Sequence, residues 1–189
     1  MAGVLSEKPN LAKALAIDGW MSKGEMQCLA HFARESLAIL EVGSYKGRSA
    51  RAIADNTWGK VYCVDPWLPD YIRDNGEKHE GIFPNVLSDF KENLKDLIEK
   101  DKVYVCQGNL TFYKDKLPRM DFAFIDGDHR YEEVKSDIEH CKKLVKHEGI
   151  IAGHDWGHKD WPGVQRAVLE LFDRDKINVH ETIWWVKNE

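Results

Sequence analysis

A short apolar run that leads into two glycines four residues apart constrains the fold of this chain more than any other feature. The run is Ala38–Val42, it contains Glu41, and Gly43 and Gly47 follow it. Glycine permits a sharp turn at the end of a strand and lets the next helix, predicted at about Arg48–Asn56, approach closely. A doubly wound α/β protein builds a nucleoside-binding loop in this way, so we expect a ligand against this turn.

The same loop excludes a dinucleotide site of the usual kind. The pattern G-x-G-x-x-G, started at Gly43, requires glycine at the positions that hold Tyr45 and Arg48. A pyrophosphate could therefore not approach the backbone as closely as it does in nicotinamide dinucleotide sites. The sequence predicts a nucleoside ligand without that diphosphate contact.

Strand-like and helix-like segments alternate along the chain, without repeats or low-complexity linkers. The predicted strands are Ala38–Val42, Lys60–Val64, Val103–Gln107, Met120–Ile125, Gly149–Ala152, Asn178–Val179 and Thr182–Val186. The predicted helices are Arg48–Asn56, Val86–Lys100, Tyr131–His147 and Pro162–Asp173, with one or two more within Leu11–Phe32. Helices between strands imply right-handed crossovers, so the sequence predicts an α/β, Rossmann-like, mostly parallel sheet with helices on both faces. The last two strands are too close for a crossover, so one of them runs antiparallel at the sheet edge.

The composition is that of a soluble, intracellular domain. The 189 residues include 27 basic and 32 acidic side chains, and the net charge of −5 gives no general attraction to nucleic acid or anionic lipid. No segment has the length and apolarity of a membrane span, and the four widely spaced cysteines are typical of reduced thiols. We expect a cytoplasmic protein of one domain, 1–189, with a helical cap at 1–36 over the pocket and a core at 37–189.

A second acid stands at the end of the next predicted strand. Asp65 follows Lys60–Val64, where a carboxylate can accept hydrogen bonds from both ribose hydroxyls of a nucleoside. Alternatively, Asp65 only caps the turn before Pro66. The pairing of this acid with the glycine loop in one βαβ unit favours the ribose role.

The most specific motifs lie in the second half of the chain. Residues 125–132 read I-D-G-D-H-R-Y-E, residues 153–156 read G-H-D-W, and residues 162–164 read P-G-V. Together with the glycine loop, these motifs resemble the class I S-adenosylmethionine (SAM) dependent methyltransferases, and within them a group of small O-methyltransferases. The resemblance covers nearly the whole chain, from about Ile17 to Trp185.

This resemblance implies a seven-stranded, mostly parallel sheet with a terminal antiparallel strand, and SAM as the cofactor. The positions that match cofactor-binding positions of the family are Glu41, Gly43, Ser44, Tyr45, Gly47, Ser49, Asp65, Trp67, Gly108, Asn109 and Asp126. In the resemblance, the polar side chain after the third strand, here Asn109, faces the adenine edge. A Gly-Asn turn also forms without any ligand, so both interpretations stay open for Gly108 and Asn109.

Two acids, Asp126 and Asp155, each stand where an apolar strand ends, with one helix between them. The carboxyl ends of neighbouring parallel strands meet in one crevice, so we expect the two carboxylates to lie together. They repel each other unless something neutralises them, and a divalent cation such as Mg²⁺ does so with hard oxygen ligands. The resemblance to metal-dependent O-methyltransferases implies Asp126, His154 and Asp155 as the metal ligands. The alternative is that the acids cap helices and pair with Arg130 or Lys159.

Histidine at position 154 departs from the family pattern, which has an oxygen ligand there. His154 leaves room for a softer metal than Mg²⁺, or for a general base instead of a ligand. Methyl transfer also requires a group that removes the acceptor proton, and the candidate catalytic residues are Asp126, His129 and His154. His129 can equally be a structural histidine bonded to the backbone of its turn.

The segment between the second strand and the following helix is long and irregular, and it carries Trp67, Tyr71 and Phe83. Its length and position indicate a lid or a substrate-contacting loop, although these aromatic residues could equally hold the loop to the body of the protein. The aromatic cluster expected in the core rather than at the cofactor consists of Trp156, Trp161, Trp184 and Trp185.

Two classes of function remain. The first is metal-assisted O-methylation of a small-molecule hydroxyl, and the second is an inactive SAM-fold module for binding or regulation. Paired carboxylates favour the first, because an inactive module has no physical need to keep like charges together. Methylation of a base or protein nitrogen loses support, because no Asn/Asp-Pro-Pro-aromatic motif follows the fourth predicted strand. The acceptor and the formation of a homo-oligomer stay open.

Overall fold

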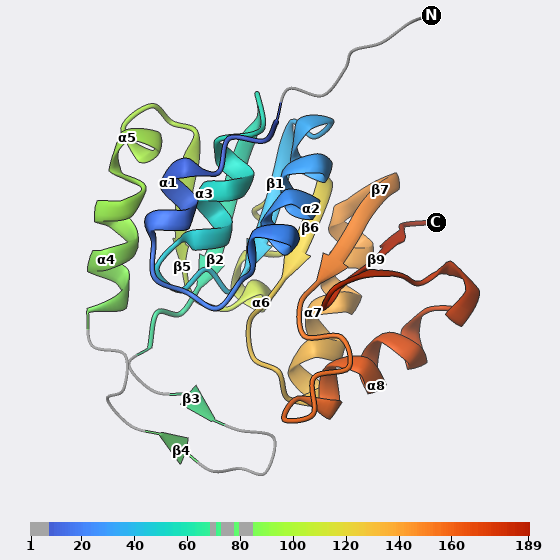
Figure 1. Cartoon of the computed structure of the whole chain (residues 1–189). Helices are drawn as coiled ribbons and strands as arrows, with labels where there is room; N and C mark the ends of the chain where they lie inside the picture. Colours follow the sequence, from blue (N-terminus) through green and yellow to red (C-terminus); the bar gives the residue numbers. More distant parts are fainter. Residues whose placement is uncertain (1–7, 69–70, 73–77, 80–84) are drawn as a thin grey trace, which may run out of the picture.

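The computed structural model describes residues 8–68, 71–72, 78–79 and 85–189. Helices cover both faces of a central sheet (Figure 1). The helices are α1 (Ala12–Ala16), α2 (Lys23–Arg34), α3 (Arg48–Ala54), α4 (Val86–Asn93), α5 (Lys95–Ile98), α6 (Leu110–Tyr113), α7 (Tyr131–Leu144) and α8 (Pro162–Leu171). The strands of the large sheet are β1 (Ala38–Val42), β2 (Lys60–Asp65), β5 (Val103–Gln107), β6 (Met120–Ile125), β7 (Val145–Gly153), β8 (Asn178–His180) and β9 (Ile183–Lys187).

The seven strands of this sheet follow the order β5-β2-β1-β6-β7-β9-β8. The first five strands in this order, β5, β2, β1, β6 and β7, pair in parallel. Strand β9 is antiparallel to both of its neighbours, β7 and β8. The predicted Rossmann-like, mostly parallel sheet with a reversed strand at the end of the chain is confirmed. Strand β8 takes the outer edge and β9 lies one position in from it. The turn between them contains Glu181 with a left-handed backbone (φ +53°).

Alternation along the strands divides the core into two layers. In β1, Ile39 packs with residues of α1 to α5, whereas its neighbour Leu40 packs with residues of α6 to α8. Successive side chains of a strand point to opposite faces of the sheet, so a strand buried on both sides is apolar throughout. Trp184 of β9 is 1% exposed and lies in the same layer as α8, so its predicted place in the core is confirmed.

The two N-terminal helices belong to the first of these layers. Ala14 of α1, together with Met26 and Leu29 of α2, is buried in the cluster that also contains β1 and α3. Helix α2 begins with a capping box: Ser22 N donates to Glu25 Oε2 at 2.7 Å, and Glu25 N donates to Ser22 Oγ at 3.1 Å. This box satisfies two backbone donors at the helix start and fixes where α2 begins.

Two of the predicted helices differ from the observed ones by more than two residues. The helix predicted over Val86–Lys100 is interrupted at Leu94, whose backbone leaves helical geometry (φ −112°, ψ 11°) while its side chain is fully buried. The helix predicted to extend to His147 ends at Leu144, because Val145 already pairs with Met120 as the first residue of β7. Pairing of a buried, β-branched residue with its neighbouring strand outweighs the helical pattern there.

Part of the segment predicted as a loop after β2 forms a short antiparallel ribbon of β3 (Tyr71–Ile72) and β4 (Lys78–His79). Phe83 and the side chain of Tyr71 lie outside the described residues. Trp67 is buried and packs on Phe90 of α4, with 4.9 Å between ring centroids. One aromatic residue of the segment therefore holds it to the body of the protein, and the lid stays a prediction.

All four cysteines, Cys28, Cys63, Cys106 and Cys141, are free, and the last three are buried. This confirms the prediction of separate thiols without disulfides. Among the helices that the structure describes, none has both the length and the apolar character needed to cross a membrane.

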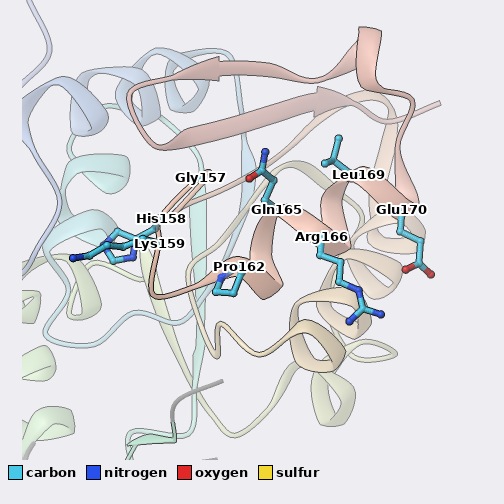
Figure 2. A pocket seen from close by; sticks show the side chains of 8 residues that line it. All are labelled: Gly157, His158, Lys159, Pro162, Gln165, Arg166, Leu169 and Glu170. Carbon is cyan, nitrogen blue, oxygen red and sulfur yellow. The ribbon is translucent and has the colours of Figure 1, made fainter. Parts of the chain in front are cut away.

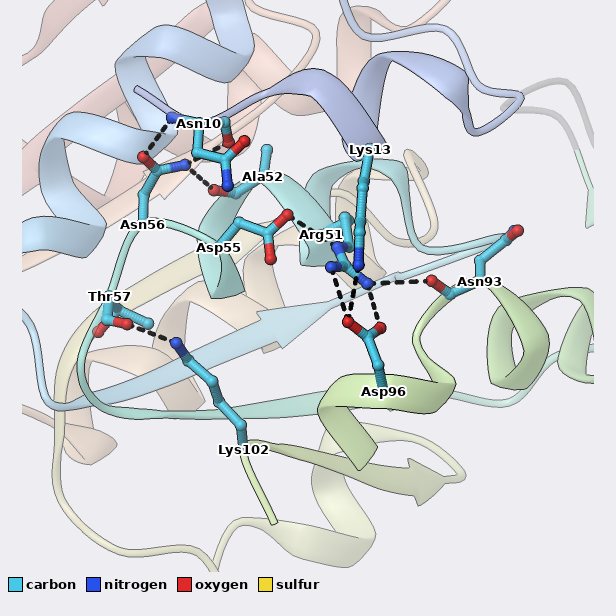
Figure 3. Close-up of polar contacts among 10 residues, drawn as sticks. All are labelled: Asn10, Lys13, Arg51, Ala52, Asp55, Asn56, Thr57, Asn93, Asp96 and Lys102. Atoms are coloured by element: carbon cyan, nitrogen blue, oxygen red, sulfur yellow. Dashed lines mark hydrogen bonds and ion pairs between the residues drawn. The ribbon is translucent and has the colours of Figure 1, made fainter. Parts of the chain in front are cut away.

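A buried arginine joins α3 to α5 (Figure 3). Arg51 is 3% exposed; its Nε donates to Asp55 Oδ2 at 2.8 Å, and its terminal nitrogens donate to the two carboxylate oxygens of Asp96 at 2.5 and 3.1 Å. Lys13 of α1 reaches Asp96 at 2.8 Å from an exposed position. Hydrogen bonds from Arg51 and Lys13 hold the pKa of Asp96 well below its usual range. The bidentate pair with Arg51 is the stronger of the two contacts, because its geometry is fixed and its charge is buried.

We predict that Arg51→Ala lowers the free energy of unfolding by about 3 kcal/mol, because two carboxylates lose their buried partner. Lys13→Ala removes only the exposed contact to Asp96 and should cost less than about 1 kcal/mol. Urea unfolding of both variants measures the difference. Equal costs would contradict a dominant role for the buried arginine.

Candidate active site

The glycine loop, residues 43–47, packs directly against the end of β6. Gly43 opens the loop with a left-handed backbone (φ +84°), and a Cβ there would lie 2.1 Å from the carbonyl oxygen of Asp126. Only glycine fits such a contact without a shift of the backbone. Asp126 N donates to Val42 O at 2.7 Å, so β1 and β6 stay paired up to the loop. Gly47 ends the loop as the N-cap of α3. The loop and Asp126 therefore form one continuous wall.

The carboxylate of Asp65 holds the glycine loop from the end of β2. Its Oδ2 accepts hydrogen bonds from Ser44 N at 2.7 Å and Tyr45 N at 2.9 Å, and its Oδ1 accepts one from Trp67 N at 2.5 Å. Burial raises the pKa of Asp65 against the opposing effect of these donors. A carboxylate accepts about four hydrogen bonds in total. Asp65 therefore shapes the turn that contains Pro66 through these three hydrogen bonds, and its contact with the ribose hydroxyls stays a prediction.

Glu41 and Ser49 support the glycine loop from inside the protein. Glu41 is fully buried, and its carboxylate accepts a hydrogen bond from the hydroxyl of Ser44. Burial raises the pKa of Glu41 to about 7, although hydrogen bonds from Ser44 and Ser49 act in the other direction. Ser49, in the first turn of α3, is also buried. Any influence of Glu41 or Ser49 on a cofactor would therefore pass through the loop.

The other predicted cofactor residues line the same edge of the sheet. The ring of Tyr45 lies 4.9 Å from that of Trp20, and the carbonyl oxygen of Tyr45 accepts a hydrogen bond from Trp67 Nε1 at 2.8 Å. At the end of β5, Gly108 N donates to Asp65 O at 2.9 Å, and Asn109 then begins α6. The backbone thus brings Gly108 and Asn109 beside the end of β2. The adenine contact of Asn109 stays a prediction.

Asp126, His154 and Asp155 come together where β6 and β7 end. His154 Nδ1 lies 3.4 Å from Asp126 Oδ1 and 3.4 Å from Asp155 Oδ2. One potential ligand atom from each of the three residues lies within 4.8 Å of the others. Because β6 and β7 are neighbouring parallel strands, the structure brings the two acids into one crevice. Asp155 adopts a left-handed backbone (φ +60°), a conformation that costs energy outside glycine and is frequent at functional sites.

His129 approaches the same carboxylates from the turn after β6. Its Nε2 lies 2.8 Å from Asp155 Oδ2 and 3.6 Å from Asp126 Oδ1. Burial lowers the pKa of His129, but its contacts with Asp126 and Asp155 outweigh burial and raise the pKa to about 9. The ring also stacks on Trp161, with 4.6 Å between centroids. Trp161 packs against the core, as expected, and its ring also covers His129.

A third carboxylate, which the sequence did not predict, completes the cluster. Glu25 of α2 places its Oε1 3.2 Å from His154 Nε2, and the Thr182 hydroxyl donates to that same oxygen. Burial opposes the ionisation of Glu25, but the nearby His154 and hydrogen bonds from Thr182 and Ser22 outweigh it and lower the pKa of Glu25 to about 2. The sequence signal at Glu25 was the capping box, which indicates a helix start rather than a site.

The carboxylates of this cluster attract positive charge strongly. Burial opposes the charging of His154, but Asp126, Asp155 and Glu25 outweigh it and raise the pKa of His154 far above its usual range. Burial also opposes the ionisation of Asp155, yet the two histidines hold its pKa below the usual range. Two carboxylate oxygens and an imidazole nitrogen suit a divalent cation. The nitrogen favours Mn²⁺, Fe²⁺ or Zn²⁺ over Mg²⁺.

The neighbouring acid, Asp128, takes the role that the alternative interpretation assigned to the site acids. Asp128 accepts hydrogen bonds from the backbone nitrogen of Arg130 at 2.9 Å and from its Nη2 at 2.6 Å. It therefore neutralises Arg130 and shapes the turn before α7. Asp126 and Asp155 face the histidines instead.

Two cavities lie near the cluster. The inner one is lined by Asp126, His129 and His154 among others, and its volume of about 10 Å³ has room for about one water molecule. The outer one is a wide, open cavity of about 690 Å³ over α8 and the loop that precedes it, with Lys159 and Arg166 on its wall (Figure 2). The inner cavity therefore fits one water molecule or one ion, whereas a larger molecule fits in the outer cavity.

The sequence matches the methyltransferase domain family over residues 40–156, which is more than half of the chain. The chain belongs to this family. The matched region starts in β1 and ends just after Asp155, so it contains the glycine loop and the paired acids together. The sequence-based assignment to the class I methyltransferases is confirmed.

One relative and two solved structures resemble this methyltransferase-domain protein at low sequence identity. "Uncharacterized protein R132" of Acanthamoeba polyphaga mimivirus is 27% identical over 143 residues, which are 74% of this chain and 61% of that protein. The chain thus spans less than two thirds of this relative's length. The cofactor-bound structure of Rv0187 from MTB has a TM-score of 0.70 at 17% identity and covers 98% of this chain and 92% of its own. The structure of an O-methyltransferase from Bacillus cereus in complex with SAH has a TM-score of 0.67 at 15% identity. The match covers 97% of this chain and 93% of that one. At these identities the two structures establish the shared fold.

We predict that the stability of the protein in chelator falls as the pH rises through the folded-state pKa of His129. Imidazolium at His129 is stabilised in the fold, with a pKa of about 9 against an ordinary value of 6.5. Its contribution is therefore complete below about pH 6.5 and disappears by about pH 9, at most about 3 kcal/mol. Denaturant unfolding across this range measures it. His129→Gln should flatten the decline, and Asp155→Asn should reduce it; a wild-type decline that His129→Gln leaves unchanged would contradict the assignment.

Proposed function

We propose that this protein is a SAM-dependent O-methyltransferase that methylates a hydroxyl of a small molecule with the help of a divalent cation at Asp126, His154 and Asp155. The observation that carries the proposal is the contact between Gly43 and Asp126. Through it, the loop suited to the cofactor and the acid cluster suited to the acceptor share one wall. A transferase needs its two substrates in such immediate contact.

Bound SAM would supply a methyl group that is already activated, so the protein has only to hold and align it. Asp65 fixes Ser44 N and Tyr45 N, and it offers Oδ1 to a ribose hydroxyl. Trp67, locked to the carbonyl of Tyr45, keeps the adjoining turn in place. These contacts are made within the protein itself, so the loop loses little conformational entropy when the cofactor binds.

A bound divalent cation would supply a Lewis acid that makes the acceptor hydroxyl more acidic. Asp126, His154 and Asp155 would hold it, since their donor atoms converge within a few ångströms. His129 stands outside this set and is our candidate for the general base. Positive charge that offsets Asp126 and Asp155 lowers the pKa of His129 from about 9 toward neutrality. His129 Nε2 can then accept the hydroxyl proton.

The test of this function is the release of S-adenosylhomocysteine from SAM in the presence of small hydroxyl compounds, including catechols and sugar derivatives. We expect release with at least one acceptor when Mn²⁺ or Mg²⁺ is present. Asp126→Asn and Asp155→Asn should each raise the barrier by about 3 kcal/mol, which lowers the rate by about two orders of magnitude. Removal of the metal with EDTA should lower the rate to the same extent.

Asp128→Asn is the matched control for these variants, because Asp128 is a neighbouring acid that pairs with Arg130 instead. This variant should stay within about threefold of the wild type. Full activity in EDTA would rule out the metal. A protein that binds SAM but transfers to none of the acceptors, with or without metal, would favour an inactive binding module.

A separate prediction concerns the cofactor. Asp65→Ala should weaken SAM binding by about 1–2 kcal/mol, because the loop loses its anchor and the ribose loses an acceptor. Asp121→Ala is the matched control: Asp121 also accepts two backbone hydrogen bonds, from Leu37 N and Ala38 N at 2.9 Å, but at the opposite end of the strands. Calorimetric titration with SAM measures both variants. Equal affinities in the wild type and Asp65→Ala would remove Asp65 from the cofactor site.

A further inference from the structure

The carboxylate of Glu25 is held from two sides by groups outside the proposed metal set. Its Oε2 accepts the hydrogen bond from Ser22 N at 2.7 Å that completes the capping box. Its Oε1 accepts the hydroxyl of Thr182, from the turn between β8 and β9. The side chain is 4% exposed. Glu25 is therefore fixed in one orientation before any contact with His154 is considered.

His154 lies between this carboxylate and the pair of acids. Its Nε2 is buried and lies 3.2 Å from Glu25 Oε1, which is an ion-pair distance without hydrogen-bond geometry. Its Nδ1 is 3.4 Å from Asp126 Oδ1 and 3.4 Å from Asp155 Oδ2. The two nitrogens of an imidazole point in different directions. A hydrogen bond at one nitrogen therefore decides which way the other faces, and which nitrogen carries the proton.

We propose that Glu25 is a positioning residue for His154: its fixed carboxylate attracts the proton of the buried Nε2 and so turns the lone pair of Nδ1 toward the cation site between Asp126 and Asp155. This inference rests on the metal role in the proposed function. Glu25 itself contacts neither acid through a described hydrogen bond and is not a ligand. It acts from α2, outside the matched family region, on a ligand that β7 carries.

Capping of α2 does not account for this arrangement. The capping box uses only Oε2 of Glu25, whereas Oε1 is turned away from the helix start, toward Thr182 and His154. Burial of an ionised carboxylate costs free energy, because both of its oxygens lose their contacts with water. The capping box compensates this loss for Oε2 only. An ion-pair contact that orients a metal-binding imidazole gives that oxygen a role.

The experiment is a titration of the chelator-treated full chain with Mn²⁺ alone, followed by calorimetry and by electron spin echo detection of a coordinated nitrogen. We expect Glu25→Ala to bind Mn²⁺ about 10–100-fold more weakly than the wild type, with a diminished nitrogen signal. Glu25→Gln should also bind Mn²⁺ more weakly than the wild type, because a single amide oxygen cannot face both Ser22 N and His154 Nε2. His154→Ala should lack the nitrogen signal altogether.

Ser22→Ala is the matched control. It removes the hydroxyl that accepts from Glu25 N, and so weakens the start of α2, but it leaves the Glu25 carboxylate facing His154. Its Mn²⁺ affinity should stay within about twofold of the wild type. SAM affinity, measured in parallel, should be unchanged in all variants and reports that each is folded.

The outcomes separate this inference from the proposed function. A wild type that binds no Mn²⁺ would overturn the metal role, and the inference with it. A wild type that binds Mn²⁺ through His154, with Glu25→Ala and Glu25→Gln binding equally well, would overturn the positioning role alone. Equal weakening in Ser22→Ala and Glu25→Ala would also overturn it, because Glu25 would then act only through the folding of α2.

Discussion

The parallel pairing of β1, β6 and β7 is the constraint on which the whole site depends. Hydrogen bonds continue past the ends of these strands: Asp126 N donates to Val42 O, and His154 N donates to Ile125 O. The backbone of each site loop is therefore tied to the strand beside it. The close approach of Gly43 to Asp126 then prevents the glycine loop from shifting without moving β6. Strand pairing fixes loops that sequence alone would leave independent.

The charge of the site conflicts with the burial that strand pairing imposes. Glu25 and Asp155 are both almost completely buried, and Asp126 lies beside them. Such a set is unfavourable unless cations are close, because carboxylates lose solvation and repel one another. In this protein His129 and His154 supply the balancing charge. A fold that retains this many buried titratable groups accepts a cost in stability, which is common at sites that bind or react.

Much of the fold follows from one local signal. Apolar runs of five or six residues with an acid at or beside their carboxyl end predict β1, β2 and β6. Because parallel strands end at one edge of a sheet, the meeting of Asp126 with Asp155 follows as well. The break at Leu94 and the early start of β7 at Val145 did not follow, because both depend on what the residue packs against. The local sequence pattern predicts where strands end. It does not predict whether a residue such as Val145 joins a helix or pairs with a neighbouring strand.

The contribution of Glu25 was hidden for a related reason. Its sequence neighbourhood encodes a helix start, and its distance from His154 is set by the packing of α2 against the sheet. Trp161 reached His129 in the same way, through a loop whose path no short motif specifies. Residues that act on a ligand from another element leave little trace in the sequence near that ligand.

The hydrogen bond between Thr182 and Glu25 joins positions 157 residues apart. Contacts of such long range form only after intervening segments have paid the entropy of bringing the chain together. The surroundings of His154 therefore depend on the N-terminal and C-terminal parts of the chain together, and not only on the strands that bring Asp126 and Asp155 into one crevice.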